Sequence, residues 1–198
     1  MQRPILSEHQ RSIIARIDQE FQRRPKGIPG TTTRPKQSTG YGRSSGFGFI
    51  RKRRYPPAPS KMNKKWPELW ALLKEFGATI GMQYDGVQVN VDCVCGPHRD
   101  KTNVGNSYLI SGGDYTGGEL VVEEELLDCK YAPLIFNGSE LTHWNKPIAS
   151  GHKWTLVYFS CLIPAHHMHY YPDGFRVTYP AYRDDLSALN LPEEKIRA

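Results

Sequence analysis

Two residues separated by a single residue, His98 and Asp100 in "GPHRDKTN", have side chains that can coordinate a metal ion. They stand where an apolar, strand-like run gives way to a polar turn. Side chains at positions i and i+2 of a strand share one face, so these two can converge on one point while Arg99 points away. A turn that holds two unrelated polar residues is the other interpretation of this pair, and a third ligand is needed to decide.

That third ligand is His143, which comes 43 residues after Asp100 at the end of "PLIFNGSELTHW". Two histidines and one carboxylate on one face of an octahedron leave three positions open, as in non-haem Fe(II) oxygenases. Ten residues later, the strand-like run "KWTLVYF" places Lys153 and Thr155 on one face. A lysine inside a barrel is costly unless an anion pairs with it. We therefore expect a bound dicarboxylate beside Lys153.

The runs around these residues predict a mainly β protein with flanking helices. Short β-branched and aromatic segments, from "ATIGMQYDGVQVNVDCVC" to "KWTLVYFSCLI", are separated by Gly, Asn, Asp and Pro. Such segments at intervals of about ten residues favour an antiparallel sandwich or barrel. Residues 65–77 predict a helix with Pro67 in its first turn. Residues 5–23 predict an amphipathic helix with a capping box formed by Ser7 and Gln10.

These patterns divide the chain into three parts. We expect residues 1–24 to form an N-terminal amphipathic helix that packs on the core, and residues 25–60 to form a basic segment rich in Gly, Pro and Arg. Residues 61–198 are expected to form the β domain, with a C-terminal capping loop. The composition of residues 25–60 favours loop or disorder, although its aromatic residues are also compatible with ordering against the core or stacking on bases.

The formal net charge of +6 conceals an asymmetry. Between Phe21 and Pro67 there are 13 Lys and Arg and no Asp or Glu, so the rest of the chain is acidic. Such a block indicates an anion-binding surface, with DNA as the leading partner and RNA as a second candidate. A solvated tail or a nuclear-localisation run is the alternative. The predicted nucleic-acid contacts are Arg43, Arg51, Lys52, Arg53 and Arg54.

Two further features concern the location of the protein. No apolar run approaches the ~20 residues that span a bilayer, and the polar start "MQRPILSEHQ" lacks the apolar core of a signal peptide. We expect an intracellular monomer without a membrane partner, and a nuclear location if the cell is eukaryotic.

With these residues considered together, residues 66–163 resemble the Fe(II)- and 2-oxoglutarate-dependent dioxygenases. The resemblance rests on H-x-D at His98 and Asp100, on the distal His143 and on Lys153. It implies a double-stranded β-helix, which is a jelly-roll or cupin-like core flanked by helices. The stretches "HRDKTNVGNS", "GDYTGGELVV" and "KWTLVYF" are most similar to the TET/JBP group of nucleic-acid base oxygenases.

The resemblance implies a role for each matching residue. The catalytic Fe(II) ligands would be His98, Asp100 and His143. Lys153 and Thr155 would hold the distal carboxylate of 2-oxoglutarate, the co-substrate, while Asn90 would contact its other end. Asn103 would approach the target base and Phe159 would stack on it. O2 would be the oxidant, and ascorbate is a candidate reductant.

Three functions are compatible with these residues. The leading hypothesis is an oxygenase that hydroxylates 5-methylcytosine or thymine in DNA, because it explains the triad, Asn103 and the basic block together. TET enzymes usually have arginine at the position of Lys153, whereas lysine there is typical of prolyl hydroxylases. The second hypothesis is therefore a 2-oxoglutarate-dependent protein hydroxylase of the prolyl type. The third is a catalytically silent nucleic-acid-binding module on a jelly-roll scaffold.

Overall fold

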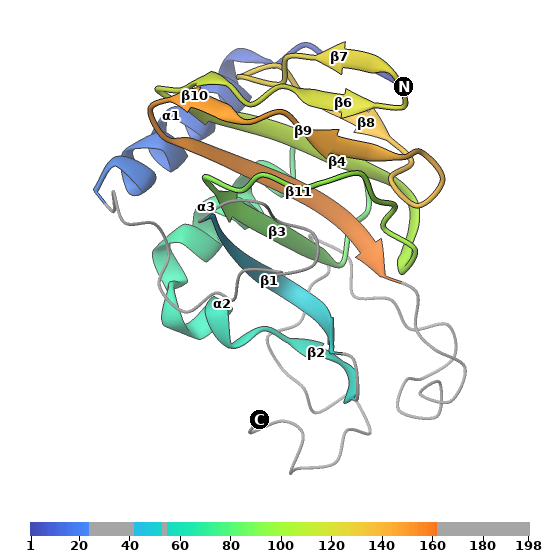
Figure 1. Ribbon diagram of the computed structural model, residues 1–198. Helices are drawn as coiled ribbons and strands as arrows, with labels where there is room; N and C mark the ends of the chain where they lie inside the picture. Colours follow the sequence, from blue (N-terminus) through green and yellow to red (C-terminus); the bar gives the residue numbers. More distant parts are fainter. Residues whose placement is uncertain (24–41, 53–54, 162–198) are drawn as a thin grey trace.

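A computed structural model of the chain describes residues 1–23, 42–52 and 55–161, and the side chains of residues 51, 52 and 55–57 are not described (Figure 1). The helices are α1 (Glu8–Gln22), α2 (Lys61–Lys65) and α3 (Pro67–Gly77). The long strands are β1 (Arg43–Lys52), β3 (Gly86–Val91), β4 (Asn103–Gly113) and β11 (Lys153–Cys161). The short strands are β2 (Tyr55–Pro59), β5 (Thr116–Gly117), β6 (Leu120–Val122), β7 (Glu125–Leu127), β8 (Leu134–Phe136), β9 (His143–Asn145) and β10 (Ile148–Ser150).

The described strands form one large and two small antiparallel sheets. The large sheet has the order β2-β1-β3-β11-β4-β8, and the small sheets have the orders β7-β6-β9 and β10-β5. In Figure 1 the small sheets lie along one side of the large sheet, while α2 and α3 lie beside β1 and β3. The prediction of a mainly β protein with flanking helices is confirmed.

The two faces of the large sheet have different partners, and strand β11 shows this most clearly. Trp154, Leu156 and Tyr158 are buried in the apolar core that the sheet shares with α1 and α3. The next residues along the strand point the other way, so Thr155, Val157 and Phe159 line a cavity between the sheets. A second apolar cluster lies on this inner side, and its buried members include Leu109, Leu120, Val122, Leu134 and Phe136.

The two longer helices form where the sequence predicts them. At the start of α1, the Ser7 hydroxyl accepts a hydrogen bond from Gln10 N at 3.2 Å, and the Gln10 side chain accepts one from Ser7 N at 2.8 Å. This is the expected capping box. Helix α3 has Pro67 in its first turn and buries Leu69, Leu73 and Phe76 against the sheet. Tyr158 of β11 donates to Leu73 O at 2.9 Å, which ties α3 to the central strand.

Strand β1 lies within the segment whose composition favours loop or disorder. Its residues 43–48 pair with β3, and its Phe47 is fully buried and stacks on Trp70 of α3. Ordering against the core, the alternative interpretation of these aromatic residues, therefore holds for residues 43–50. The β sheet accordingly begins before residue 61, which the sequence analysis gave as the start of the β domain.

Some predictions fall on parts of the chain that lie outside the described residues. These include Arg53, Arg54 and the C-terminal capping loop that follows residue 161. Within residues 1–23, 42–52 and 55–161, no helix is long and apolar enough to cross a membrane.

Candidate active site

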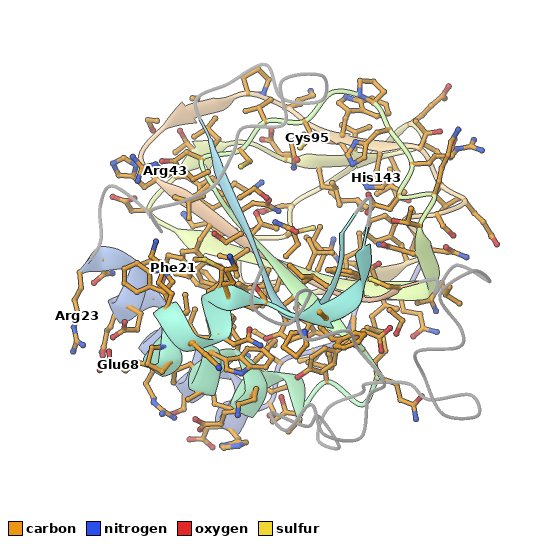
Figure 2. All side chains as sticks on the ribbon, turned by 90° about the horizontal axis from the view of Figure 1, so that it is seen from below. Phe21, Arg23, Arg43, Glu68, Cys95 and His143 are labelled. Carbon is orange, nitrogen blue, oxygen red and sulfur yellow. The ribbon has the colours of Figure 1, made fainter. Side chains whose placement is uncertain are left out.

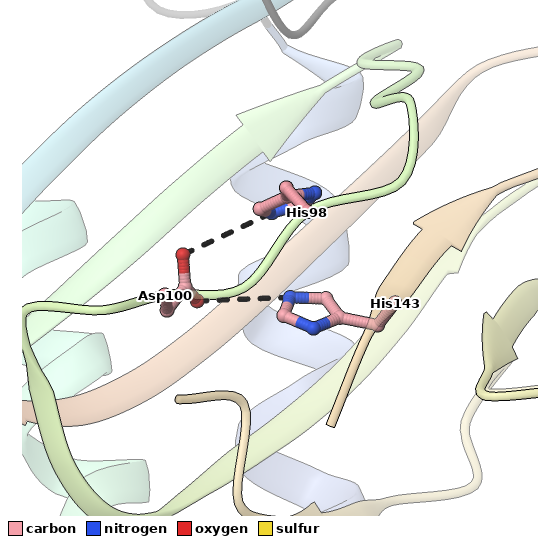
Figure 3. A group of neighbouring side chains, drawn as sticks. All are labelled: His98, Asp100 and His143. Carbon is pink, nitrogen blue, oxygen red and sulfur yellow. Dashed lines mark ion pairs between the residues drawn. The ribbon is translucent and has the colours of Figure 1, made fainter. Parts of the chain in front are cut away.

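The backbone brings His98, Asp100 and His143 together beside β9, the edge strand of the sheet β7-β6-β9 (Figure 3). The chain at His98 runs antiparallel to β9: His98 N donates to His143 O at 3.1 Å, and His143 N donates to His98 O at 3.0 Å. Asp100 N donates to Gly138 O at 2.8 Å, in the loop that precedes β9. These main-chain bonds place the distal histidine beside the H-x-D motif.

The three side chains point at a common centre. His98 Nε2 lies 3.8 Å from Asp100 Oδ1, and His143 Nε2 lies 3.7 Å from Asp100 Oδ2. All three potential ligand atoms lie within 4.8 Å of one another. A single ion between them can therefore bind all three.

The hydrogen bonds of the two imidazoles prepare their nitrogens for a metal. Nδ1 of His98 lies 2.9 Å from Gly96 O, and Nδ1 of His143 lies 3.0 Å from Leu141 O. Because a carbonyl oxygen can only accept, each Nδ1 must carry the proton, and each Nε2 keeps its lone pair toward Asp100. Burial lowers the pKa of His143, and the neighbouring His98 lowers it further, against the raising effects of the Leu141 carbonyl and Asp100. Two neutral imidazoles and one carboxylate with open positions fit Fe(II).

A cavity of about 290 Å³ opens beside this triad. Its lining includes all three candidate ligands and four further residues that the sequence analysis singled out, which are Asn90, Asn103, Thr155 and Phe159. In Figure 2, His143 and Cys95 lie on the side of the barrel away from the helices that carry Phe21 and Glu68. The cavity is therefore separated from the helices by the large sheet.

Two of these predicted residues already have partners. Asn103 Nδ2 donates to Asp100 Oδ2 at 3.4 Å, so the amide contacts the carboxylate of the triad. Asn90 Oδ1 accepts a hydrogen bond from Ser44 Oγ at 2.7 Å. Asn103 is thus placed directly at the candidate metal centre, and Asn90 is held on the inner face of the large sheet.

Lys153 is buried, but it does not line the cavity at the triad. Its Nζ donates to Gly118 O and lies 5.3 Å from the centre of the Tyr115 ring. Among the described residues, no carboxylate lies within 4.0 Å of this ammonium group. Burial lowers the pKa of Lys153. A buried cation without a carboxylate partner suits an anionic ligand better than a structural role.

Sequence reasoning missed the residues that surround Lys153. Tyr115 OH and Ser111 Oγ are 2.9 Å apart, both residues are buried, and burial raises the pKa of Tyr115 to about 12. Tyr115 therefore stays protonated. Because one of the two hydroxyls donates to the other, one proton of the pair remains for an anion. The signal in the sequence was weak: a tyrosine in "GDYTGG", two residues before Gly117 and Gly118, which both adopt positive φ.

The predicted nucleic-acid contacts are placed only in part. Arg43 is half-buried at the start of β1. In Figure 2, Arg43 and His143 both lie away from the helices, on opposite sides of the barrel. Arg51 and Lys52 belong to β1 by their backbone. Gly42 and Ser44 line the cavity, whereas Arg43 alternates with them and shares the opposite face of β1 with Phe47.

Comparison with known proteins identifies the fold. No protein-family model matches this sequence, and no curated protein sequence matches it. Among solved structures, NgTET1 in complex with 5mC DNA has a TM-score of 0.56 at 14% identity, over 79% of this chain and 69% of that chain. A 2OG-Fe(II) oxygenase family protein from Burkholderia pseudomallei has a TM-score of 0.49 at 15% identity, over 78% and 79% of the two chains. A Pseudomonas putida prolyl-4-hydroxylase has a TM-score of 0.48 at 11% identity, over 81% and 92%.

The similarity to NgTET1 concerns the fold. The prediction of a double-stranded β-helix core is confirmed.

Proposed function

We propose that this protein is an Fe(II)- and 2-oxoglutarate-dependent dioxygenase that hydroxylates a methylated base, 5-methylcytosine or thymine, in DNA. The observation that carries the proposal is the convergence of His98, Asp100 and His143, each imidazole with its Nδ1 proton on a backbone carbonyl, at the wall of a cavity. The shared fold with a protein solved in complex with 5mC DNA supports it.

In this proposal the three converging residues hold the iron, and the buried polar group around Lys153 holds the co-substrate. Bound Fe(II), with 2-oxoglutarate and O2, supplies the oxidising power to hydroxylate an unreactive C–H bond while 2-oxoglutarate is converted to succinate and CO2. Lys153 gives the positive charge for the distal carboxylate. Thr155, on the same face of β11, and one hydroxyl of the Ser111 and Tyr115 pair give hydrogen-bond donors.

Lys153 must first exchange its present acceptor. Its ammonium group donates to Gly118 O, and a carboxylate that reaches it would form a charge-assisted hydrogen bond, which is stronger than a bond to a neutral carbonyl. We therefore expect the lysine side chain to turn toward the co-substrate when the latter binds.

The remaining cavity residues are assigned to the substrate. Phe159 offers a flat apolar surface and Asn103 an amide next to the triad, so a planar base can enter with its methyl group toward the iron. A stacked duplex would keep that methyl group out of reach, so the base must be flipped out or arrive in a single strand. Basic residues of the 21–67 block would neutralise the phosphates on either side.

One observation favours a second candidate, a protein hydroxylase of the prolyl type. The cation assigned to the co-substrate is lysine, which binds a carboxylate as a point charge and without the bidentate fork of arginine. A protein hydroxylase of the prolyl type does not explain the basic block or the position of Asn103, and we rank it second for that reason.

Product analysis tests the proposal. The protein is incubated with Fe(II), 2-oxoglutarate, ascorbate and methylated DNA, and the digested nucleosides are identified by mass spectrometry beside a His98→Ala control. Oxidised bases formed by the wild type alone are the expected result. The second candidate would be favoured instead if a proline-rich peptide stimulated succinate formation and DNA did not.

A further inference from the structure

Three polar side chains of the large sheet form one hydrogen-bonded chain in the cavity. They are Ser44 on β1 and Gln88 and Asn90 on β3, and all three line the cavity beside the triad. Gln88 Nε2 donates to Ser44 Oγ, and Ser44 Oγ donates to Asn90 Oδ1 at 2.7 Å. The two carboxamides are therefore held in place by a single hydroxyl group.

The single proton of the Ser44 hydroxyl determines which groups of Gln88 and Asn90 remain free to bind a ligand. Ser44 can donate to only one of the two amides and must accept from the other. The amide oxygen of Gln88 and the amino group of Asn90 remain, and neither has a hydrogen-bond partner among the described residues. If both amides were turned around, the remaining groups would be the amino group of Gln88 and the oxygen of Asn90. In either arrangement the pair offers one acceptor and one donor.

Strand register places the two amides at different depths of the cavity. Asn90 pairs with Thr155, which lies next to Lys153 on the inner face of β11. Gln88 pairs with Val157, and the next inward residue of β11 is Phe159. Residues two apart on a strand are separated by about 7 Å. Asn90 therefore belongs to the end assigned to the co-substrate, and Gln88 lies toward the end assigned to the substrate.

The residue opposite Gln88 on strand β1 is a glycine. Gly46 of β1 is the register partner of Gln88, and a Cβ atom there would lie 3.7 Å from Gln88 Oε1 and 3.0 Å from Ile50 Cγ2. A side chain at residue 46 would therefore contact the Gln88 amide and crowd Ile50, and glycine avoids both contacts.

We propose that Gln88 is a specificity-determining residue whose carboxamide hydrogen-bonds the edge of the planar base that Phe159 contacts. Ser44 is the positioning residue that orients this carboxamide and links it to Asn90. The inference rests on the proposed function and narrows its substrate class. A nucleobase has donors and acceptors along its edge, whereas the ring of a prolyl residue has no such edge to satisfy an amide.

The test uses a methylated oligonucleotide and two independent readouts. The first is kcat and KM for the oligonucleotide, and the second is the slow turnover of 2-oxoglutarate without DNA. Gln88→Leu is expected to lower kcat/KM for the oligonucleotide about tenfold, the effect of one lost hydrogen bond with its partner left unpaired. Its turnover of 2-oxoglutarate without DNA should fall less than its turnover with DNA, since Gln88 reaches the co-substrate end only through Ser44 and Asn90.

Ser44 is tested by a pair of variants. Ser44→Ala should lower kcat/KM for the oligonucleotide, as Gln88→Leu does. Ser44→Thr keeps the hydroxyl and should have a kcat/KM close to that of the wild type. Gln19→Leu, at an exposed glutamine of α1, is the matched control and should leave both readouts unchanged. Thermal melting of each variant shows whether the fold is kept.

The outcomes separate the inference from the proposed function. Unchanged kcat/KM in Gln88→Leu would overturn the inference, and so would a parallel loss of 2-oxoglutarate turnover without DNA, which would assign Gln88 to the co-substrate or to the fold. A wild-type protein that turns over 2-oxoglutarate but oxidises no base would overturn the DNA substrate, and the role of Gln88 with it.

Discussion

His143 Nε2 lies 3.7 Å from Asp100 Oδ2, although 43 residues separate the two in the chain. Main-chain hydrogen bonds between the His98 segment and β9 create this proximity, and the Nδ1 bond of each histidine to a carbonyl oxygen sets its orientation. The site is therefore arranged by the backbone before any ion binds. Such preorganisation is what a binding site needs to hold a metal tightly.

Removal of any one triad side chain is expected to abolish tight metal binding. His98→Ala, Asp100→Ala and His143→Ala each remove one of three ligands, and we expect at least about 100-fold weaker affinity. Calorimetric titration with Mn²⁺, which avoids oxidation, measures this. His152→Ala is the control, because His152 is exposed and binds Asp92 at 2.9 Å, away from the triad. Wild-type affinity in all three triad variants would contradict the assignment.

Lys153→Met is expected to separate stability from co-substrate binding. Loss of the charge should raise KM for 2-oxoglutarate at least about tenfold, because the distal carboxylate loses its cation. The ligand-free variant should melt at the same temperature as the wild type or higher, since burial of an ammonium group without a carboxylate partner costs free energy. Lys146→Met, at an exposed lysine, is the control. A lower melting temperature with unchanged KM would instead give Lys153 a structural role.

Gly138 is predicted to be intolerant of a side chain because of the triad. A Cβ atom there would lie 3.3 Å from His143 Cε1 and 3.5 Å from Asp100 Oδ2. Gly138→Ala should weaken metal binding severalfold, and Gly138→Val more strongly, while the far-UV circular dichroism stays unchanged. Gly81→Ala is a useful comparison because that glycine has open space around it, although its φ of +65° adds backbone strain. Metal affinity in Gly138→Val equal to that of the wild type would show that the triad adapts freely.

The basic block is expected to bind DNA through phosphates. Because β1 belongs to the large sheet, deletion of residues 25–60 would remove a strand, and substitutions are the better test. Arg51, Lys52, Arg53 and Arg54 replaced together by Gln should reduce the slope of log affinity against log salt by up to about four. Lys146→Gln is the single-charge control outside the block. An unchanged slope would leave these residues without the predicted role.

The candidate metal ligands could be selected from the sequence by residue type and spacing, although strand periodicity does not produce their geometry. His98 forms only an isolated bridge and Asp100 lies outside the strands. His143 begins β9, and the run "PLIFNGSELT" that precedes it contains β8 and a loop. The surroundings of Lys153 were not predictable in this way. Tyr115 and Gly118 reach it through a loop that folds back between β4 and β6, and local spacing carries no information about such a contact.

Strand β1 shows the limit of composition as evidence. Its glycines and arginines are typical of loops, and the burial of Phe47 against Trp70 of α3 outweighs that local preference. The link between Ser44 and Gln88 depends in turn on the register of β1 and β3, which only the folded sheet reveals.

The most direct test of the account is the turnover of 2-oxoglutarate by the iron-loaded protein. Purified protein is supplied with Fe(II), 2-oxoglutarate and O2, and succinate is quantified beside Asp100→Ala, with the melting temperature of both proteins measured. The account predicts succinate from the wild type and none above background from a folded Asp100→Ala. No succinate from the iron-loaded wild type, or equal amounts from both proteins, would contradict it.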